Sequence, residues 1–185
     1  MTIAMLAFVA GSIFCGLALS ARRFWRMRGT RLVTCPENRA TVAVELQATL
    51  AAVTGLAGRP TLRLKDCSRW PEKEGCGREC LRQIESAPEG CLVRRILAAW
   101  YEDKHCVICG KNVGQADLMQ RAPGPLTPEG VTIEWVELEP EKIPEALRTH
   151  MPVCFDCHVV STLRRRFPDL VVDRPWDREA LGGKH

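Results

Sequence analysis

Two pairs of cysteines in the C-terminal half of the chain constrain its fold more than any other feature. Each pair has the spacing Cys-x2-Cys, and 44 residues separate the pairs. The four residues are Cys106, Cys109, Cys154 and Cys157. Two thiolates at this spacing can reach one ion, and Gly110 can take the positive φ that turns backbone amides toward sulfur. The pattern predicts a structural zinc ion held by four cysteines, with a hairpin between the pairs and a helix beginning at the second pair.

The order of these parts resembles a treble-clef zinc finger, in which a knuckle and strands precede two ligands at the start of a helix. Together with His158, the two pairs also resemble the zinc frame of HNH nucleases, over roughly residues 104 to 167. HNH nucleases carry an Asp-His pair between the knuckles to activate a catalytic metal. The intervening stretch here contains only His150, outside such a setting. The resemblance therefore implies a zinc-stabilised frame without the nuclease residues.

An uncharged apolar segment opens the chain, from Thr2 to Ser20. As a helix rising about 1.5 Å per residue, its 19 residues nearly cross a hydrocarbon core of about 30 Å. A cleaved signal peptide is the rival interpretation, because Ala18–Ser20 offers small residues, but no basic residues precede the segment. A lipoprotein signal at Cys15 is not expected, since bulky Phe14 precedes it. We predict a single membrane-spanning helix.

Five arginines follow this segment within ten residues: Arg22, Arg23, Arg26, Arg28 and Arg31. The formal net charge is +4, so the rest of the chain carries −1, which argues against a nucleic-acid-binding face. The positive-inside rule places the basic flank in the cytoplasm and the N-terminus outside the inner (plasma) membrane. The side chains expected at the lipid interface are Arg22, Arg23, Phe24, Trp25 and Arg26. A flank that serves only solubility is the alternative.

The segment Cys154-Phe-Asp-Cys157-His158 also matches the haem attachment sequence C-x-x-C-H. In that chemistry both thiols bond to the porphyrin and the histidine ligates iron. Haem attachment requires the opposite side of the membrane from the one predicted here. His105 and His158 adjoin the cysteine pairs, and we expect them to support the site or lie at the surface.

Five further cysteines lie between the basic flank and the first pair: Cys35, Cys67, Cys76, Cys80 and Cys91. Four of them are enough for a second zinc ion or for an iron–sulfur cluster, although their spacing is not a standard one. The predicted set is Cys35, Cys67, Cys76 and Cys80. Packing as small buried thiols is the alternative, and disulfides would follow if the predicted orientation is wrong. Cys91, which precedes Leu92, suits packing.

The fold class predicted is α+β: one transmembrane helix, then one or two small zinc-stabilised domains of which the C-terminal part is treble-clef-like. Apolar periodicity and glycine or proline breaks predict helices over residues 48–57, 77–86, 92–101, 140–150 and 158–167. A hairpin is predicted over 31–46, and further strands over 61–65 and 131–135. The predicted organisation is a membrane anchor (1–21), a basic juxtamembrane segment (22–31), a cysteine-containing subdomain (32–103), a zinc-binding subdomain (104–168) and an irregular tail (169–185).

Several phrases in the chain resemble a family of bacterial membrane-anchored, cysteine-rich proteins. They are Cys67-Ser-Arg-Trp-Pro71, Gly75-Cys-Gly-Arg-Glu-Cys-Leu81, Cys91-Leu-Val-Arg94 and Pro168-Asp-Leu-Val-Val-Asp-Arg174. This resemblance implies the architecture of an anchored domain and no particular activity.

No Ser-His-Asp set, phosphate-binding glycine loop or open three-ligand metal site is apparent, and zinc with four cysteine ligands is coordinatively closed. The sequence therefore favours a non-catalytic scaffold or adaptor that binds a protein partner at the membrane. The alternative is a membrane-associated redox protein with an iron–sulfur or thiol centre or, less favoured, a c-type haem. A nucleic-acid binder would rest on the nuclease-like frame and Arg164–Arg166 alone.

Overall fold

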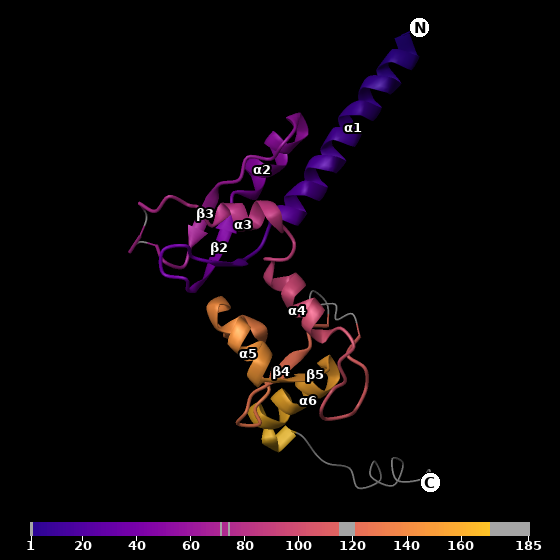
Figure 1. Ribbon diagram of the computed structural model, residues 1–185. Helices are drawn as coiled ribbons and strands as arrows, with labels where there is room; N and C mark the ends of the chain where they lie inside the picture. Colours follow the sequence, from indigo (N-terminus) through magenta and orange to yellow (C-terminus); the bar gives the residue numbers. More distant parts are fainter. Residues whose placement is uncertain (1, 71, 74, 115–120, 171–185) are drawn as a thin grey trace. The chain divides into compact units, whose positions relative to one another are not determined.

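The computed structural model describes residues 2–70, 72–73, 75–114 and 121–170, and it has mixed helices and sheets (Figure 1). The chain divides into two compact units. Unit 1 consists of Met1–Ala99 with Glu139–Ile143, and unit 2 consists of Trp100–Leu138 with Pro144–His185. The predicted tail beyond residue 170 lies outside the described residues.

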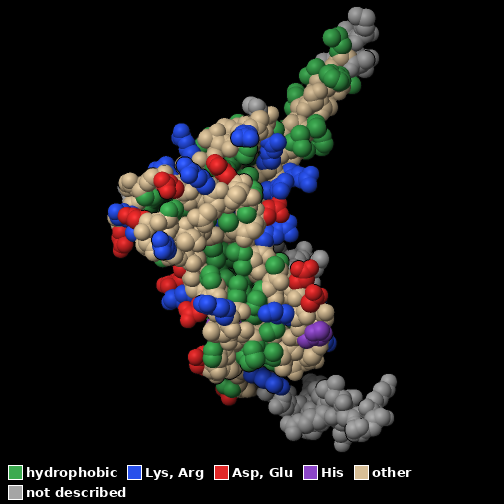
Figure 2. All heavy atoms as spheres, in the orientation of Figure 1, with side chains coloured by type: hydrophobic (Ala, Val, Ile, Leu, Met, Phe, Trp, Pro, Cys, Tyr) green, Lys and Arg blue, Asp and Glu red, His purple; other side chains and the backbone are tan. Residues whose placement is uncertain are grey.

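Helix α1 covers Thr2–Met27 and so continues past the uncharged segment into the arginines. Its segment Ala7–Met27 is long and apolar enough to cross a membrane, although a signal sequence has the same properties. Large apolar side chains such as Phe8 and Phe14 are about three-quarters exposed, at 77% and 75%. Figure 2 shows hydrophobic side chains along this helix and Lys and Arg side chains near its end. Among the described residues, none of the most apolar part of Ala7–Met27 is buried, which leaves its apolar surface free for lipid, and only the end of the helix at Met27 packs against the core of unit 1.

A three-stranded antiparallel sheet forms the centre of unit 1, in the order β1 (Arg31–Thr34), β2 (Thr41–Leu46), β3 (Leu64–Cys67). The predicted hairpin over 31–46 is confirmed. Every second residue of β2 is buried, which places one face of the sheet in the core. The core residues are Val33, Val42, Val44, Leu46, Leu64, Cys67, Cys80 and Ile84.

After α1, the first part of unit 1 contains α2 (Ala48–Thr54), the 3-10 turn η1 (Gly55–Ala57), α3 (Leu81–Ser86) and most of α4 (Val93–Tyr101). The helices predicted over 48–57 and 92–101 are confirmed. Two other predictions were displaced. The third strand begins at Leu64 rather than residue 61, because it pairs with β2 only from there. Helix α3 begins at Leu81 rather than residue 77, so Cys80 is its N-cap and Cys76 lies before it.

Unit 2 has short elements: β4 (Gly124–Leu126), η2 (Trp135–Glu137), most of α5 (Ile143–Thr149), β5 (Met151–Val153), α6 (Phe155–Arg166) and η4 (Pro168–Leu170). The turn η3 (Pro140–Lys142) lies in the part of the chain that returns to unit 1. β4 and β5 pair antiparallel. The strand predicted over 131–135 was wrong. Thr132 makes only an isolated bridge to Leu126, and Trp135 turns into the 3-10 helix that buries its ring.

The centre of unit 2 is a cluster of three aromatic rings from Trp100, Tyr101 and Trp135. The rings meet edge to face, with centroids 4.7 to 6.3 Å apart. The Trp135 indole N–H donates to the Tyr101 hydroxyl at 2.9 Å, and the Trp100 indole N–H donates to the carbonyl of Leu147 at 2.9 Å. Each of the two indole N–H groups thus has an acceptor, so the tryptophan rings can pack in unit 2 without leaving a donor unpaired.

Candidate metal centre

The first cysteine pair lies in a tight loop closed by backbone hydrogen bonds. The amide of Cys106 donates to the carbonyl of Lys111 at 2.8 Å, and the amide of Gly110 donates back to the carbonyl of Cys106 at 2.8 Å. Gly110 has φ +71°, a conformation that L side chains rarely adopt. The loop therefore turns sharply just after Cys109, and both thiols lie on the same turn.

The second pair lies where β5 passes into α6. Cys154 is the N-cap of α6, and Cys157 lies in its first turn. The N-terminal end of a helix carries a partial positive charge, which favours anionic thiolates. The amide of Val107 donates to the carbonyl of Pro152 on β5 at 3.0 Å, and this bond joins the loop of the first pair to the strand that leads into the second.

These connections bring Cys106, Cys109, Cys154 and Cys157 together. All four sulfur atoms lie within 4.8 Å of one another, and those of Cys109 and Cys154 are 3.7 Å apart. A tetrahedral zinc ion with Zn–S bonds of about 2.3 Å places its sulfur ligands about 3.8 Å apart. All ten cysteines are free thiols, so no disulfide uses these sulfurs. The group could hold a metal ion, and its geometry suits a four-sulfur tetrahedral site.

The environment of this group favours negative charge on the sulfur of Cys106 and opposes it on the sulfurs of Cys154 and Cys157. Burial tends to raise the pKa of Cys106, but backbone amides of Cys154, Cys109 and Ile108 outweigh it and lower the pKa to about 6. Burial and the neighbouring sulfurs of Cys109 and Cys154 raise the pKa of Cys157 far above its usual range. Four thiolates so close repel one another, and a bound cation would relieve that repulsion.

The histidines beside the pairs do not belong to the four-sulfur group. His105 is exposed, and its backbone forms an isolated antiparallel β-bridge with Asn112. His158 is buried, only 7% exposed, and its ring lies directly against the backbone of Gly124. Burial lowers its pKa, and its Nδ1 has no hydrogen-bond partner among the described residues. His158 is therefore a core residue of unit 2.

This placement weighs against the haem interpretation of Cys154, Cys157 and His158. Both thiols already belong to the group formed with Cys106 and Cys109. The histidine that would ligate iron is buried against Gly124. The second pair is arranged to complete a four-cysteine site.

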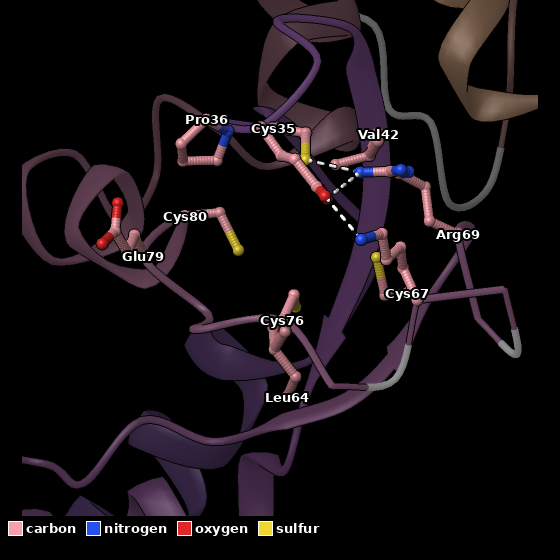
Figure 3. Close-up of a pocket in the computed structure, with 11 residues that line it drawn as sticks. Cys35, Pro36, Val42, Leu64, Cys67, Arg69, Cys76, Glu79 and Cys80 are labelled. Carbon is pink, nitrogen blue, oxygen red and sulfur yellow. Dashed lines mark hydrogen bonds and ion pairs between the residues drawn. The ribbon is translucent and has the colours of Figure 1, made fainter.

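The second predicted set, Cys35, Cys67, Cys76 and Cys80, lies around one cavity of about 230 Å³ in unit 1 (Figure 3). Among the described residues, only the Cys106 group has all its ligand atoms within 4.8 Å of one another. The four cysteines of the second set thus line one cavity, but their sulfur atoms are not all as close together as those of the first set. Cys91 does not line the cavity; it packs against the core of unit 1, as expected.

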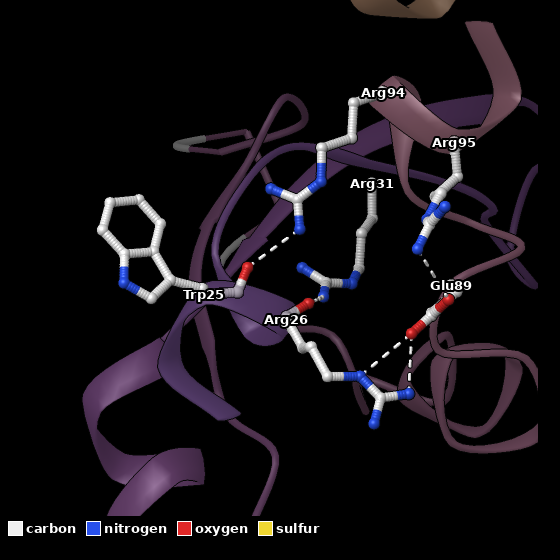
Figure 4. Close-up of polar contacts among 6 residues, drawn as sticks. All are labelled: Trp25, Arg26, Arg31, Glu89, Arg94 and Arg95. Carbon is white, nitrogen blue, oxygen red and sulfur yellow. Dashed lines mark hydrogen bonds and ion pairs between the residues drawn. The ribbon is translucent and has the colours of Figure 1, made fainter. Parts of the chain in front are cut away.

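The predicted interface residues Arg22, Arg23, Phe24, Trp25 and Arg26 form the last turns of α1. Arg26 pairs with Glu89 at 2.6 Å (Figure 4). Arg31, expected in the same flank, is instead fully buried. Its guanidinium donates to the carbonyls of Met27, Gly29 and Arg26 at 2.7 to 3.0 Å. Arg31 therefore caps the end of α1 instead of lying exposed in the basic flank, a role that no local sequence signal reveals.

Comparison of the chain with protein-family models, with curated proteins and with solved structures finds no match. The class of protein follows from the chain's own features. It is a mixed α and β protein whose described residues contain one candidate membrane-spanning helix and a four-cysteine group that could hold a metal ion.

Proposed function

We propose that this chain is a single-pass membrane protein whose unit 2 is a zinc-stabilised, non-catalytic adaptor that binds a protein partner at the cytoplasmic face. The proposal rests mainly on the proximity of four sulfur atoms, which lie within 4.8 Å of one another: those of Cys106, Cys109, Cys154 and Cys157. Four thiolates close the coordination shell of zinc and leave no open position for substrate, which suits a structural ion.

The surrounding structure supports a treble-clef-like frame. A tight loop carries the first two cysteines, an antiparallel strand pair follows, and α6 begins at the second pair. The two named strands of unit 2 are short, since β4 and β5 have three residues each, and the one long helix among its described residues, α6, has only His158 buried. A unit built from such elements has little aliphatic core, so a bound ion would supply much of its folding free energy.

Exposed aliphatic side chains beside the site support an adaptor role. Val107 and Ile108 lie between the first two cysteines and are 47% and 52% exposed. Met151 on β5 is 46% exposed. Because Val107 is hydrogen bonded to Pro152, these side chains lie on neighbouring segments. Apolar side chains presented on a rigid loop are suited to an apolar groove on a protein partner.

Metal analysis of the full chain in detergent tests the zinc part of this proposal. We expect Cys106→Ser to lose one zinc ion per chain relative to the wild type and to unfold unit 2, seen as lost helical circular dichroism. Cys15→Ser is the matched control, because this thiol lies on α1 outside both cysteine groups. A Cys106→Ser protein that keeps its full zinc content would contradict the assignment.

Site-specific photocrosslinking in cells tests the adaptor part. A photoreactive residue at Ile108 should give adducts of higher mass, whereas one at exposed Glu102 serves as the control. Adducts at neither position, or equally at both, would argue against a docking surface at the first cysteine pair.

A further inference from the structure

Three separate segments of unit 1 each bring cysteine to the same cavity. Cys35 lies at the turn after β1, Cys67 ends β3, and Cys76 and Cys80 precede α3. Figure 3 shows their side chains arranged around the cavity from different sides. Cys35 and Cys76 are 41 positions apart in sequence, and only the fold brings them to the same cavity. The arrangement is not a local sequence motif.

The cavity itself argues against simple packing of these thiols. Cysteine packs well as a small apolar residue, and packing would close the space around it. Here a volume of about 230 Å³ remains, lined also by Val42 and Leu64. Cys67 and Cys80 are buried on it, at 8% and 7% exposed. The cavity opens to solvent on one side, so an ion can reach the thiols from the surface.

Positive side chains lie at the rim of this cavity. Arg69 donates to the Sγ of Cys35 at 3.1 Å and to Glu37 at 2.9 Å. Lys73 pairs with the same glutamate at 2.7 Å. The carboxylate of Glu79 is directed away from the sulfurs in Figure 3. An N–H donor to a ligating sulfur orients that ligand, and nearby cations offset the negative charge of a thiolate site.

We propose that Cys35, Cys67, Cys76 and Cys80 form a second thiolate site, which takes one zinc ion. The donor set is the same as in unit 2, and sulfur sites bind Zn²⁺ more tightly than Fe²⁺. Each thiol that is still protonated releases its proton to solvent when the ion binds. This site does not rest on the proposed function of unit 2.

Binding requires the four sulfurs to move closer together than they are here. The segment that carries Cys76 has no helix or strand in its described residues before α3. Arg78, between Cys76 and Cys80, has φ +54°, which is uncommon for a residue other than glycine. This left-handed residue turns the chain so that both cysteines face the same cavity. Cys76 is thus the ligand best placed to close the site.

The test is zinc content per chain of the full-length protein in detergent, with variants that separate the two sites. We expect two zinc ions in the wild type and one in Cys76→Ser, whose side chain lies outside the core cluster of unit 1. The double variant Cys154→Ser, Cys157→Ser should also retain one zinc ion per chain. Cys91→Ser is the matched control in unit 1 and should retain two.

Cobalt replacement gives a second readout that does not depend on the Cys76 variant. The Cys154→Ser, Cys157→Ser protein, refilled with Co²⁺, should show the thiolate charge-transfer and tetrahedral d–d bands of one site. Adding Cys76→Ser should abolish them. One zinc ion in the wild type, lost with Cys154 and Cys157 but kept in Cys76→Ser, would overturn this inference and leave the unit 2 site standing. Iron with acid-labile sulfide in unit 1 would overturn the zinc assignment.

Discussion

At the scale of single residues, Arg31 shows how a charge can be buried without an acidic partner. The last carbonyls of a helix lack partners within the helix and form its partly negative end. Arg31 donates to two such carbonyls, those of Arg26 and Met27, and to the carbonyl of Gly29 just beyond the helix. Arg94 donates to the carbonyls of Trp25 and Arg28, and Figure 4 shows the bonds to Arg26 and Trp25. Burial, reinforced by the nearby Arg94 charge, lowers the pKa of Arg31. Backbone dipoles at the end of α1 therefore stabilise the charge.

Arg31→Met tests this cap. The variant leaves three carbonyls without their donor, and we expect unit 1 to lose about 2 kcal/mol of unfolding free energy. Arg95→Met is the control, since Arg95 is 62% exposed and makes only a 3.4 Å ion pair with Glu89. Urea unfolding in detergent measures both. Equal stability of the two variants would show that the cap contributes little.

Gly124 is a second residue whose importance only its neighbours reveal. A Cβ at this position would lie 2.5 Å from the Nδ1 of His158 and 2.8 Å from the carbonyl oxygen of Ile133. We expect Gly124→Ala to destabilise unit 2 by about 1 to 3 kcal/mol, since neither the buried ring nor the backbone can yield. Gly75→Ala is the control, because a Cβ there meets nothing within 4 Å. Thermal unfolding of Gly124→Ala that matches the wild type would contradict the packing.

At the scale of elements, one hydrogen bond joins the end of α4 to η2 within unit 2. Tyr101 is fully buried, and its hydroxyl accepts from the indole N–H of Trp135. Burial raises the pKa of Tyr101 well above its usual range, so the hydroxyl stays neutral. The bond lets two short elements share an aromatic core that neither could bury alone.

The hydrogen bond between Tyr101 and Trp135 can be tested by comparing the unfolding free energies of single and double variants. Tyr101→Phe leaves the Trp135 N–H buried without an acceptor, and we expect a loss of about 1 to 2 kcal/mol. The double variant Tyr101→Phe, Trp135→Phe should lose less unfolding free energy than the two single variants lose together, because it leaves neither group of this hydrogen bond unpaired. Additive losses in denaturant unfolding would show that the hydrogen bond is not coupled.

At the scale of the whole molecule, the orientation of the chain decides which chemistry its cysteines can perform. Ten free thiols are stable in a reducing compartment, whereas an oxidising one would form disulfides. The arginines that follow the uncharged apolar segment predict a cytoplasmic location for both units. The burial of Arg31 reduces that flank to four arginines, which still lie on one side of the apolar segment.

Protease protection in spheroplasts, whose inner membrane is exposed to the medium, tests this orientation. A tag after His185 should resist external protease and be digested once the membrane is permeabilised, and the full chain should stay in the membrane pellet after alkaline washing. A tag that an external protease removes from intact spheroplasts would reverse the orientation and reopen the disulfide and haem alternatives. Release of the chain by alkaline washing would refute the membrane span.

The sequence alone determined the features that depend on local spacing and periodicity. The apolar helix, the hairpin over residues 31–46 and the pairing of cysteines within each Cys-x2-Cys follow from residues close together in the chain. Only the tertiary structure decided that Arg31 caps α1, that His158 packs against Gly124 and that Trp135 begins a 3-10 turn instead of ending a strand. Each of these depends on contacts with distant segments, which no local pattern encodes. For the same reason, the cavity shared by Cys35, Cys67, Cys76 and Cys80 became visible only in the folded chain.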